Sequence, residues 1–567
     1  MSSGIGIAGG VADGAPRMLH WAIGLTLLVN ALVMLTPLIN EGDSVLYAAL
    51  AQHMVQSGDY WSLVLDGKDW LDKPHFPFWL GALSFKLLGI SPLTYALPGF
   101  VFHLLGAYFT YRIARLWYGR ATALLALLVF VSVYHVMYST TALKAEAFLT
   151  GSITGACYYW LRWDSANRWR HLVLGAALSA MAVMTKGIFT LITISSGLVC
   201  LWAYQGRLRQ LLRLRWLAAL ALTLVFLAPE IYALYWQFDS HPEKVVFGQT
   251  GVSGIRFFLW DSQFGRFFNS GPIRNVEGNP WYFVHVFLWA FLPWVAAFGM
   301  ALVQGLRGFG QGSATARAAF VYLCASFLVT FALFSATAFQ LDYYTVIVYP
   351  FAAIMCADFL YKRLQAGASN RLLAAQWAMT LITLGLAWVI CLQVGQTSLT
   401  TFLGLACLAW LALGWVMRQA GPTMALLVHP VLAVNLLYLV LEGMTLIAHT
   451  GHAVSYRVLP ALAREPQLPV LVYALDPTVA WDIGLARQSA PSQSVGALQE
   501  LPAPGQNYFL LARTDALPSL AAHIGPAKSV LQGQWVDHKT GTLPRQIRLA
   551  AGKEEGEAYT LLRVQAP

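Results

Sequence analysis

Charged residues are scarce in this chain. Asp, Glu, Lys and Arg together make up 11% of its 567 residues, whereas hydrophobic residues make up 58%. A chain with so little charge cannot cover a water-soluble core of this size with polar surface. The shortage of charge excludes an ordinary soluble protein and predicts a polytopic α-helical membrane protein.

Cysteine is rare as well, and all six cysteines fall in apolar runs of helix-spanning length. The segments expected outside the membrane contain none, which excludes both a disulfide framework and a thiolate metal site. The basic residues behind the net charge of +10 are spread loop by loop instead of along one face. This pattern excludes nucleic acid as a partner and places them beside membrane lipid headgroups.

Apolar runs of about 20 residues, the length that crosses a bilayer, are frequent in the chain. They cover 18–39, 92–111, 121–139, 145–161, 216–235, 281–305, 318–338, 343–360, 372–394, 397–417 and 424–447. The longer run 171–204 lies between two basic loops, so the positive-inside rule requires an even number of crossings. We read it as two helices with the turn at Thr185-Lys186-Gly187. The expectation is about thirteen transmembrane helices.

The same rule predicts the domain organisation. Residues 1–17 are expected in the cytoplasm, and 18–451 form a transmembrane domain whose loops 40–91 and 236–280 lie outside. From residue 452 onward, short β-type runs alternate with polar segments that contain Pro and Gly. Residues 452–567 are therefore predicted to form a small soluble α/β domain on the outer side.

Ionisable residues collect in the outer loops. Apart from Lys186 at the turn within 171–204, the charged residues in the apolar runs are Glu146, Glu230, Asp358 and Glu442, all near the ends. A conduit for ions or solutes places its ionisable groups at mid-membrane. The distribution favours chemistry at the outer surface over transport.

Several short motifs occur along the first 360 residues. They are Asp43-x-x-x-Tyr47-Ala48, Ser57-Gly58-Asp59-Tyr60, Asp72-Lys73-Pro74, Met184-Thr185-Lys186-Gly187, Arg266-Phe267, Leu292-Pro293-Trp294 and Tyr349-Pro350. Together they resemble the C-class, polyprenyl-phosphate-dependent glycosyltransferases, with the bacterial lipid A aminoarabinose transferases as the nearest branch and protein O-mannosyltransferases as relatives. The resemblance covers about the first 360 residues.

This resemblance implies a multi-pass enzyme of the bacterial inner membrane with a periplasmic active site. It would move a sugar, by resemblance an aminosugar, from an undecaprenyl phosphate donor to a phosphate of lipid A. Such a modification of lipopolysaccharide masks negative charge and weakens the binding of cationic peptides such as polymyxin. Protein or another envelope glycan remains open as the acceptor. A lipid or sugar transporter, or flippase, is the alternative class.

Glycosyl transfer from a lipid phosphate leaves negative charge on the departing phosphate, which preorganised cations must oppose. Lys73, Lys186 and Arg266 stand in outer segments and are the candidate phosphate-binding residues, with Arg able to bind through two parallel hydrogen bonds. Lys186, at a tight turn, could instead be an interfacial anchor.

A carboxylate on the attacking side suits the oxocarbenium-like transition state. Asp43 is the catalytic candidate: as general base for a hydroxyl acceptor, or as an orienting group for a phosphate acceptor. Glu146 is expected to assist it. The remaining substrate-positioning candidates are Glu41, Tyr47, Asp72, Asp342, Tyr343 and Tyr344.

The chain departs from the family's pattern at several positions. Gln263 stands where a His is common, Asp72 where Glu is usual, and Gln340-Leu341-Asp342-Tyr343 replaces a Lys-Leu-Pro-His pattern. No His, Cys or carboxylate spacing indicates a metal site. The prediction is no metal ligand set and no certain cofactor, with a divalent metal ion left open. The identity of the sugar and the stereochemical outcome are also left open by these departures.

Overall fold

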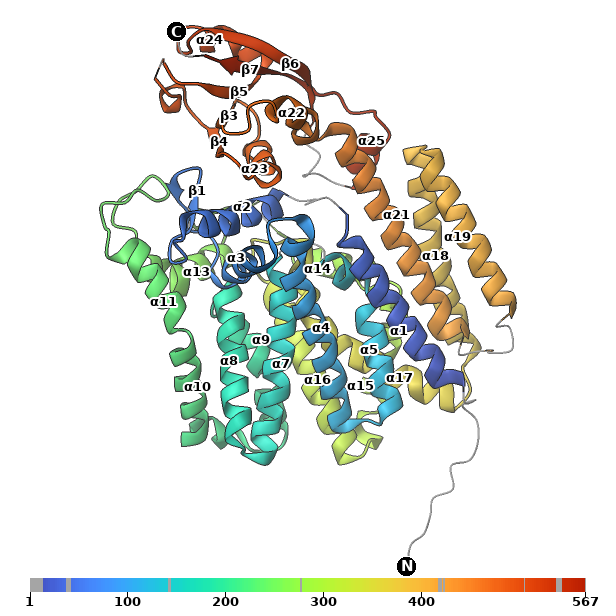
Figure 1. Cartoon of the computed structure of the whole chain (residues 1–567). Helices are drawn as coiled ribbons and strands as arrows, with labels where there is room; N and C mark the ends of the chain where they lie inside the picture. The colour runs from blue at the N-terminus through green and yellow to red at the C-terminus, as the bar shows by residue number, and fades with distance from the viewer. Residues whose placement is uncertain are drawn as a thin grey trace, which may run out of the picture.

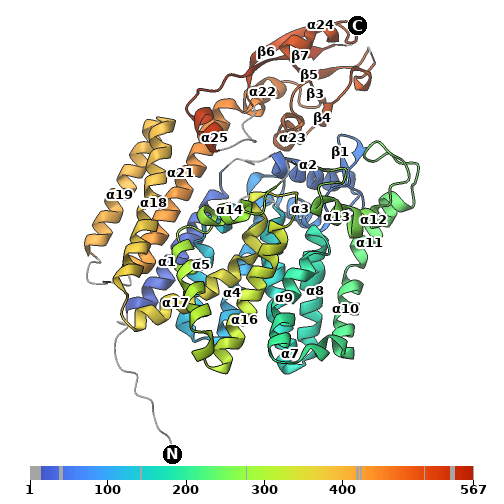
Figure 2. The same cartoon turned by 180° about the vertical axis from the view of Figure 1, so that it is seen from behind.

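The structure is a computed structural model that describes residues 14–36, 42–140, 144–275, 278–416, 421, 424–503, 505–536 and 543–565. Its helices form a broad layer, and a small sheet with its own helices lies across one end of that layer (Figures 1 and 2). The helix α2 (Gly42–Ser57) and the hairpin of β1 (Val64–Leu65) and β2 (Lys68–Asp69) lie between the two parts.

A helix or a helix pair occupies each predicted apolar run. In chain order these are α1 (Gly14–Val33), α4 (Pro92–Trp117), α5 (Arg120–Val131), α7 (Ala145–Ala166), α8 (Trp169–Lys186), α9 (Thr190–Tyr204), α10 (Leu214–Phe226) with α11 (Ala228–Leu234), α14 (Tyr282–Ala290) with α15 (Val295–Arg307), α16 (Ala314–Ser335), α17 (Tyr349–Gln365), α18 (Asn370–Val394), α19 (Thr397–Val416) and α21 (His429–His452). The run 171–204 forms two helices as predicted, because Gly187, with φ 105°, ends α8.

Within the described residues, five helices are long and apolar enough to cross a membrane, and up to seven spans result if each bent helix pair counts as one. Five shorter apolar helices accompany them. The chain is thus a polytopic helical membrane protein, as its composition predicts. The count of about thirteen crossings stays a prediction.

The expectation of one helix over 281–305 is wrong. The axes of α14 and α15 differ by 116°. Pro293 lies in the break between them and has no N–H to continue a helix. The predicted run 121–139 is interrupted too: α5 ends at Val131, and the short helix α6 (Tyr134–Tyr138) follows.

These two interruptions lie against each other. The backbone N–H of Tyr134 donates to the carbonyl oxygen of Leu292 at 3.1 Å, and the indole N–H of Trp294 donates to Ser132 Oγ at 3.0 Å. Gln376 of α18 donates to the carbonyl of Pro293 at 3.1 Å. Polar backbone groups released by each break are therefore satisfied by protein, which buried backbone in a membrane domain requires.

Short elements at the sheet-bearing end of the helical layer carry the outer loops. They are α2, the β1–β2 hairpin, α3 (Phe76–Leu88), α12 (Gly254–Arg256) and α13 (Ser262–Phe267). A hydrophobic cluster that includes Tyr47, Leu63, Leu71 and Phe258 packs them together. The outer loops thus form a packed layer.

The sheet beyond α21 has the strand order β4-β3-β5-β7-β6. Its strands are β3 (Val470–Tyr473), β4 (Ser492–Val495), β5 (Tyr508–Arg513), β6 (Ala527–Trp535) and β7 (Glu557–Val564), accompanied by α22 (Val454–Leu462), α23 (Pro477–Ala486), α24 (Leu517–Leu520) and α25 (Leu543–Ala550). β3 pairs in parallel with β4 and β5, with Val470 opposite Phe509, whereas β7 runs antiparallel to β5 and β6. The predicted division into domains at residue 452 stays a prediction.

Candidate functional site

The segment that carries Asp72 and Lys73 follows a tight hairpin. Asp66 and Gly67 join β1 to β2 with φ angles of 50° and 73°. A two-residue turn of this kind requires positive φ at both positions, which Asp-Gly tolerates best. The turn sends the chain back toward the helical layer, where Asp72 and Lys73 meet α13.

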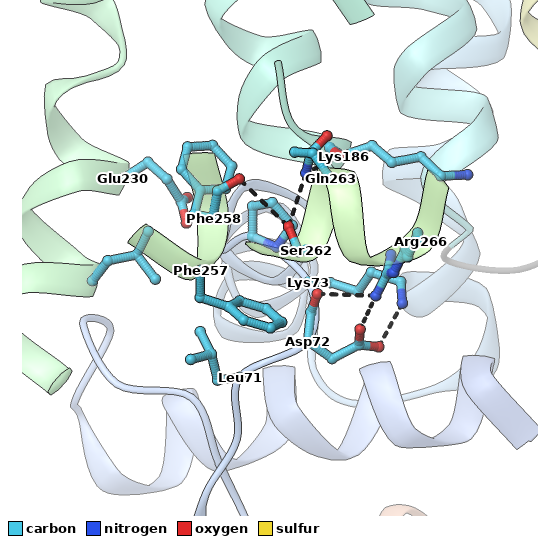
Figure 3. A pocket seen from close by; sticks show the side chains of 12 residues that line it. Leu71, Asp72, Lys73, Lys186, Glu230, Phe257, Phe258, Ser262, Gln263 and Arg266 are labelled. Atoms are coloured by element: carbon cyan, nitrogen blue, oxygen red, sulfur yellow. Dashed lines mark hydrogen bonds and ion pairs between the residues drawn. The ribbon is translucent and has the colours of Figure 1, made fainter. Parts of the chain in front are cut away.

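Asp72 lies between two cations. Lys73 Nζ is 2.5 Å from one carboxylate oxygen of Asp72, and the Arg266 guanidinium donates to the other (Figure 3). Arg266 also donates to the backbone carbonyl of Asp72 at 3.4 Å. One carboxylate thus fixes the positions of two cations from segments 194 residues apart.

Burial and charge act together on these groups. Burial alone would raise the pKa of Asp72, but the neighbouring charges of Lys73 and Arg266 and their hydrogen bonds outweigh it and lower that pKa. The pKa of Lys73 is lowered, by burial and then by the Arg266 charge, although Asp72 opposes both effects. The cluster of Asp72, Lys73 and Arg266 carries one net positive charge, so it is suited to an anion.

A second ion pair lies at two helix ends nearby. Lys186, the last residue of α8, is 2.6 Å from the carboxylate of Glu146 in the first turn of α7. Only 2% of the Glu146 side chain and 17% of the Lys186 side chain are exposed. Lys186 also lies 3.7 Å from the ring centroid of Tyr344. The charge of Lys186 is therefore balanced by Glu146, whereas Asp72 balances only one of the two positive charges in its cluster.

The neighbouring tyrosines line the same region. The ammonium of Lys144 lies 5.0 Å from the ring centroid of Tyr343, and Lys186 lies 5.7 Å from it. Asp342 begins the same short helical segment, and its charge acts on Tyr282. Tyr343 and Tyr344 thus contact the cations directly, as cation–π neighbours.

Asp43 stands in the first turn of α2 with an exposed side chain. Its charge acts on Lys73 and on Tyr47. Tyr47 is buried and packs edge-on against Phe78, with the ring centroids 5.2 Å apart. Glu41 lies outside the described residues.

The segment that carries Asp72 and Lys73 ends at a buried pair, His75 and Glu230. The sequence analysis did not single out this pair as functional. His75 Nδ1 is 3.0 Å from Glu230 Oε1, and the backbone N–H of His75 donates to Glu230 Oε2 at 3.0 Å. Both side chains are fully buried. The two residues are 155 positions apart, so no spacing in a single sequence could have linked them.

The cations border two hollows. One of about 330 Å³ is lined by Asp72, Lys73, Lys186 and Arg266 with Gln263 (Figure 3). A second, of about 720 Å³, shares Lys186, Ser262, Gln263 and Arg266 with the first. Its remaining lining is mostly apolar: Leu149, Phe189, Thr190, Thr193, Phe267, Leu333, Phe334, Thr337, Phe339, Tyr344 and Ile347. Positive charge therefore lies where a hollow of mixed polar and apolar lining meets a mostly apolar one.

Gln263 fills the position between the two hollows. Its amide donates to Ser262 Oγ at 2.9 Å and to the carbonyl of Lys186 at 3.4 Å. Within the described residues, no group of three or more His, Cys, Asp or Glu side chains is arranged to hold a metal ion.

Comparisons with known proteins bear on the fold. The profile of the dolichyl-phosphate-mannose-protein mannosyltransferase family matches residues 72–236. The crystal structure of ArnT from Cupriavidus metallidurans bound to undecaprenyl phosphate superposes with a TM-score of 0.71 at 17% identity, over 97% of this chain and 98% of that one. The chain therefore has the fold of that ArnT structure.

Curated relatives indicate which branch of transferases the chain resembles. The undecaprenyl phosphate-alpha-4-amino-4-deoxy-L-arabinose arabinosyl transferase of Yersinia enterocolitica is 25% identical over 64% of this chain and 65% of its own. The enzyme of the same name from Pseudomonas aeruginosa is 26% identical over 70% of this chain and 67% of its own. The chain spans about half to two thirds of these and other curated relatives. The predicted resemblance to the aminoarabinose transferase branch is confirmed.

Proposed function

We propose that this chain is a glycosyltransferase of the bacterial inner membrane that moves a sugar from a polyprenyl phosphate to an acceptor at the outer face. More specifically, it transfers an aminosugar from undecaprenyl phosphate to a phosphate of lipid A. The observation that carries the proposal is the position of Lys186 and Arg266 on the lining of a mostly apolar hollow, with Lys73 on the adjoining hollow that shares both residues. A lipid-linked phosphate needs cations for its headgroup beside apolar surface for its chain.

In the donor half of the reaction, the bond between the anomeric carbon and a phosphate oxygen breaks, and the electron pair remains on that oxygen. Lys73 and Arg266 oppose the charge that develops there, and Asp72 holds both in place before the donor arrives. Because the cations are already oriented, little reorganisation is needed in the transition state. Lys186 adds positive charge from the other side, moderated by Glu146.

In the acceptor half, an acceptor oxygen forms the new bond to the anomeric carbon. If this oxygen belongs to a hydroxyl, its proton passes to Asp43, which acts as general base. If it belongs to a phosphate of lipid A, no proton needs to move, and Asp43 orients the acceptor or the sugar. The exposed position of Asp43, with its charge acting on Lys73, supports either role.

The topology proposed with this function places residues 1–17 in the cytoplasm and the sheet of residues 452–567 in the periplasm, with about thirteen crossings between them. The basic loops support this orientation. The candidate site and the sheet lie at the same end of the helical layer (Figure 1), as a periplasmic site requires.

The test is mass spectrometry of lipid A from cells that carry wild-type protein, Asp43→Ala, or Glu243→Ala at equal membrane levels. Glu243 is the matched control, since it is an exposed carboxylate of the loop 236–280. We expect a sugar-sized mass increment with wild type and Glu243→Ala, and none with Asp43→Ala. An increment with all three proteins would remove Asp43 from the centre of the reaction.

No increment with any of the three would overturn lipid A as the acceptor and favour another envelope acceptor. The transporter alternative is tested separately with purified protein. Release of labelled sugar from a polyprenyl phosphate in detergent, without any gradient, is expected of a transferase and excluded for a transporter.

A further inference from the structure

The carboxylate of Asp66 is held by the carboxyl-terminal sheet and its helices. The indole N–H of Trp481 in α23 donates to one of its oxygens at 3.0 Å. The backbone N–H of Ser494 in β4 donates to the other at 3.0 Å. Both donors are more than 400 residues away in the chain, 415 and 428 positions respectively.

Packing reinforces these hydrogen bonds. Trp481 and Leu485 of α23 pack against the hydrophobic cluster that contains Leu63 and Leu71, on either side of the hairpin turn. The amide of Gln52 in α2 donates to the carbonyl of Gly484 at 3.0 Å. The contact is therefore a packed interface with part-buried hydrogen bonds, which are more costly to lose than exposed ones.

The hairpin is held on its other side by the loop 236–280. Gln237 accepts from the backbone N–H of Leu63 at 2.9 Å and donates to the Leu63 carbonyl at 2.8 Å. Lys244 lies 2.9 Å from Asp69. The strands of the hairpin are thus held from one side and its turn, through Asp66, from the other.

We propose that Asp66 is a positioning residue, through which the carboxyl-terminal sheet holds the hairpin that leads into Asp72 and Lys73. Its role rests on the proposed function of those two residues. Asp66 lines neither of the two hollows. It fixes the turn six positions before Asp72, so that a shift at the turn is carried along the chain to Lys73.

The proposal assigns the carboxyl-terminal sheet a part in donor binding. Without the Asp66 contact, the turn keeps its Asp-Gly sequence but loses its fixed direction. Lys73 then samples more positions. Binding of the donor phosphate must order the segment, and the entropy cost of this ordering weakens binding.

The experiment uses the full chain in lipid nanodiscs and compares wild type with Asp66→Asn, Trp481→Phe and Glu500→Gln. Trp481→Phe keeps a ring and removes the N–H donor. Glu500→Gln is the control: it breaks an exposed ion pair with Lys68 of the same hairpin, 69% of whose side chain is exposed. Hydrogen exchange of residues 62–75 is measured without substrate, and binding of undecaprenyl phosphate is measured separately.

We expect faster exchange of residues 62–75 in Asp66→Asn and Trp481→Phe, and binding of undecaprenyl phosphate weakened about threefold to tenfold, as loss of one or two hydrogen bonds implies. Glu500→Gln should match wild type in both measurements. Exchange in β3 and β5 reports whether the sheet remains folded. If Asp66→Asn disturbs it, the decision rests on Trp481→Phe.

The proposal would be overturned if Trp481→Phe matched the Glu500→Gln control in both hydrogen exchange and binding. Faster exchange with unchanged binding would overturn it as well, because the contact would then be structural only. If wild type fails to bind undecaprenyl phosphate, the proposed function fails, and the exchange data still show whether the sheet orders the hairpin.

Discussion

The two charged corners of the candidate site, the Asp72 cluster and the ion pair of Lys186 and Glu146, differ in net charge. At Asp72, one carboxylate serves two cations, both supplied by outer segments. At Glu146, one carboxylate serves one cation, and both stand at helix ends. The first corner keeps a net positive charge, whereas the second is neutral. The difference supports the proposal that Lys73 and Arg266 bind phosphate, with the pair of Lys186 and Glu146 forming the wall beside them.

The largest effect is expected at Arg266. Arg266→Ala removes one cation and leaves Asp72 paired with Lys73 alone, so the Asp72 cluster becomes neutral. We expect sugar transfer to fall about 100-fold or more, the cost of removing a preorganised group that meets developing charge. Rates with labelled donor and purified protein measure this. Arg363→Ala, which removes an arginine that bonds Gln304, is the control; equal losses in both would contradict the comparison.

Breaking the other corner should reduce stability more than chemistry. Lys186→Met leaves the buried carboxylate of Glu146 without its cation, and we expect a loss of about 3 kcal/mol in unfolding free energy. The double variant Lys186→Met/Glu146→Gln should recover most of it. Thermal unfolding in detergent measures both. A double variant as unstable as the single one would show that Glu146 does not depend on Lys186.

The turn after Lys186 provides a smaller test. Gly187 has φ 105°, and a Cβ there would collide with the Gln263 side chain. Gly187→Ala should cost about 2 kcal/mol through backbone strain and this collision. Gly187→Ala/Gln263→Ala should recover the part due to the collision. Thermal unfolding decides, and no recovery would assign the whole cost to the backbone.

The smallest effect is a shift in pH dependence. Because burial and the Arg266 charge lower the pKa of Lys73, its charge is lost as pH rises through a value below that of an ordinary lysine. Binding of undecaprenyl phosphate should therefore weaken on the alkaline side. Lys73→Arg stays charged and should move this decline to higher pH. Binding measured across alkaline pH checks the direction, and identical curves would exclude Lys73 as the titrating group.

Much of the helical part was predictable, because long apolar runs and basic loops are local signals. The two helices within 171–204 follow from them. The candidate residues Lys73, Lys186, Arg266, Glu146 and Tyr344 also come together in the structure. That these residues belong to one site was predicted from the family motifs, because composition does not encode distances across the fold.

Other features were beyond single-sequence reasoning. Asp72 was expected to position substrate, but nothing local indicates that it pairs with Arg266. The bond between His75 and Glu230 joins the starts of two helices, α3 and α11, that lie far apart in the sequence. The bend at Pro293 was missed, because apolar composition over 281–305 outweighed the effect of proline on helix continuity. Long-range partners and the path of broken helices depend on tertiary packing.

The two facing helix interruptions at Val131–Tyr134 and Ala290–Val295 have a consequence for how this chain can change. Each break supplies what the other lacks: a carbonyl from one accepts the amide hydrogen of the other. A substitution that straightened α14 and α15 would strand the Tyr134 amide in an apolar interior, and one that straightened α5 would strand the Leu292 carbonyl. Neither helix can become regular alone. A single substitution that regularises either helix therefore leads through a less stable protein.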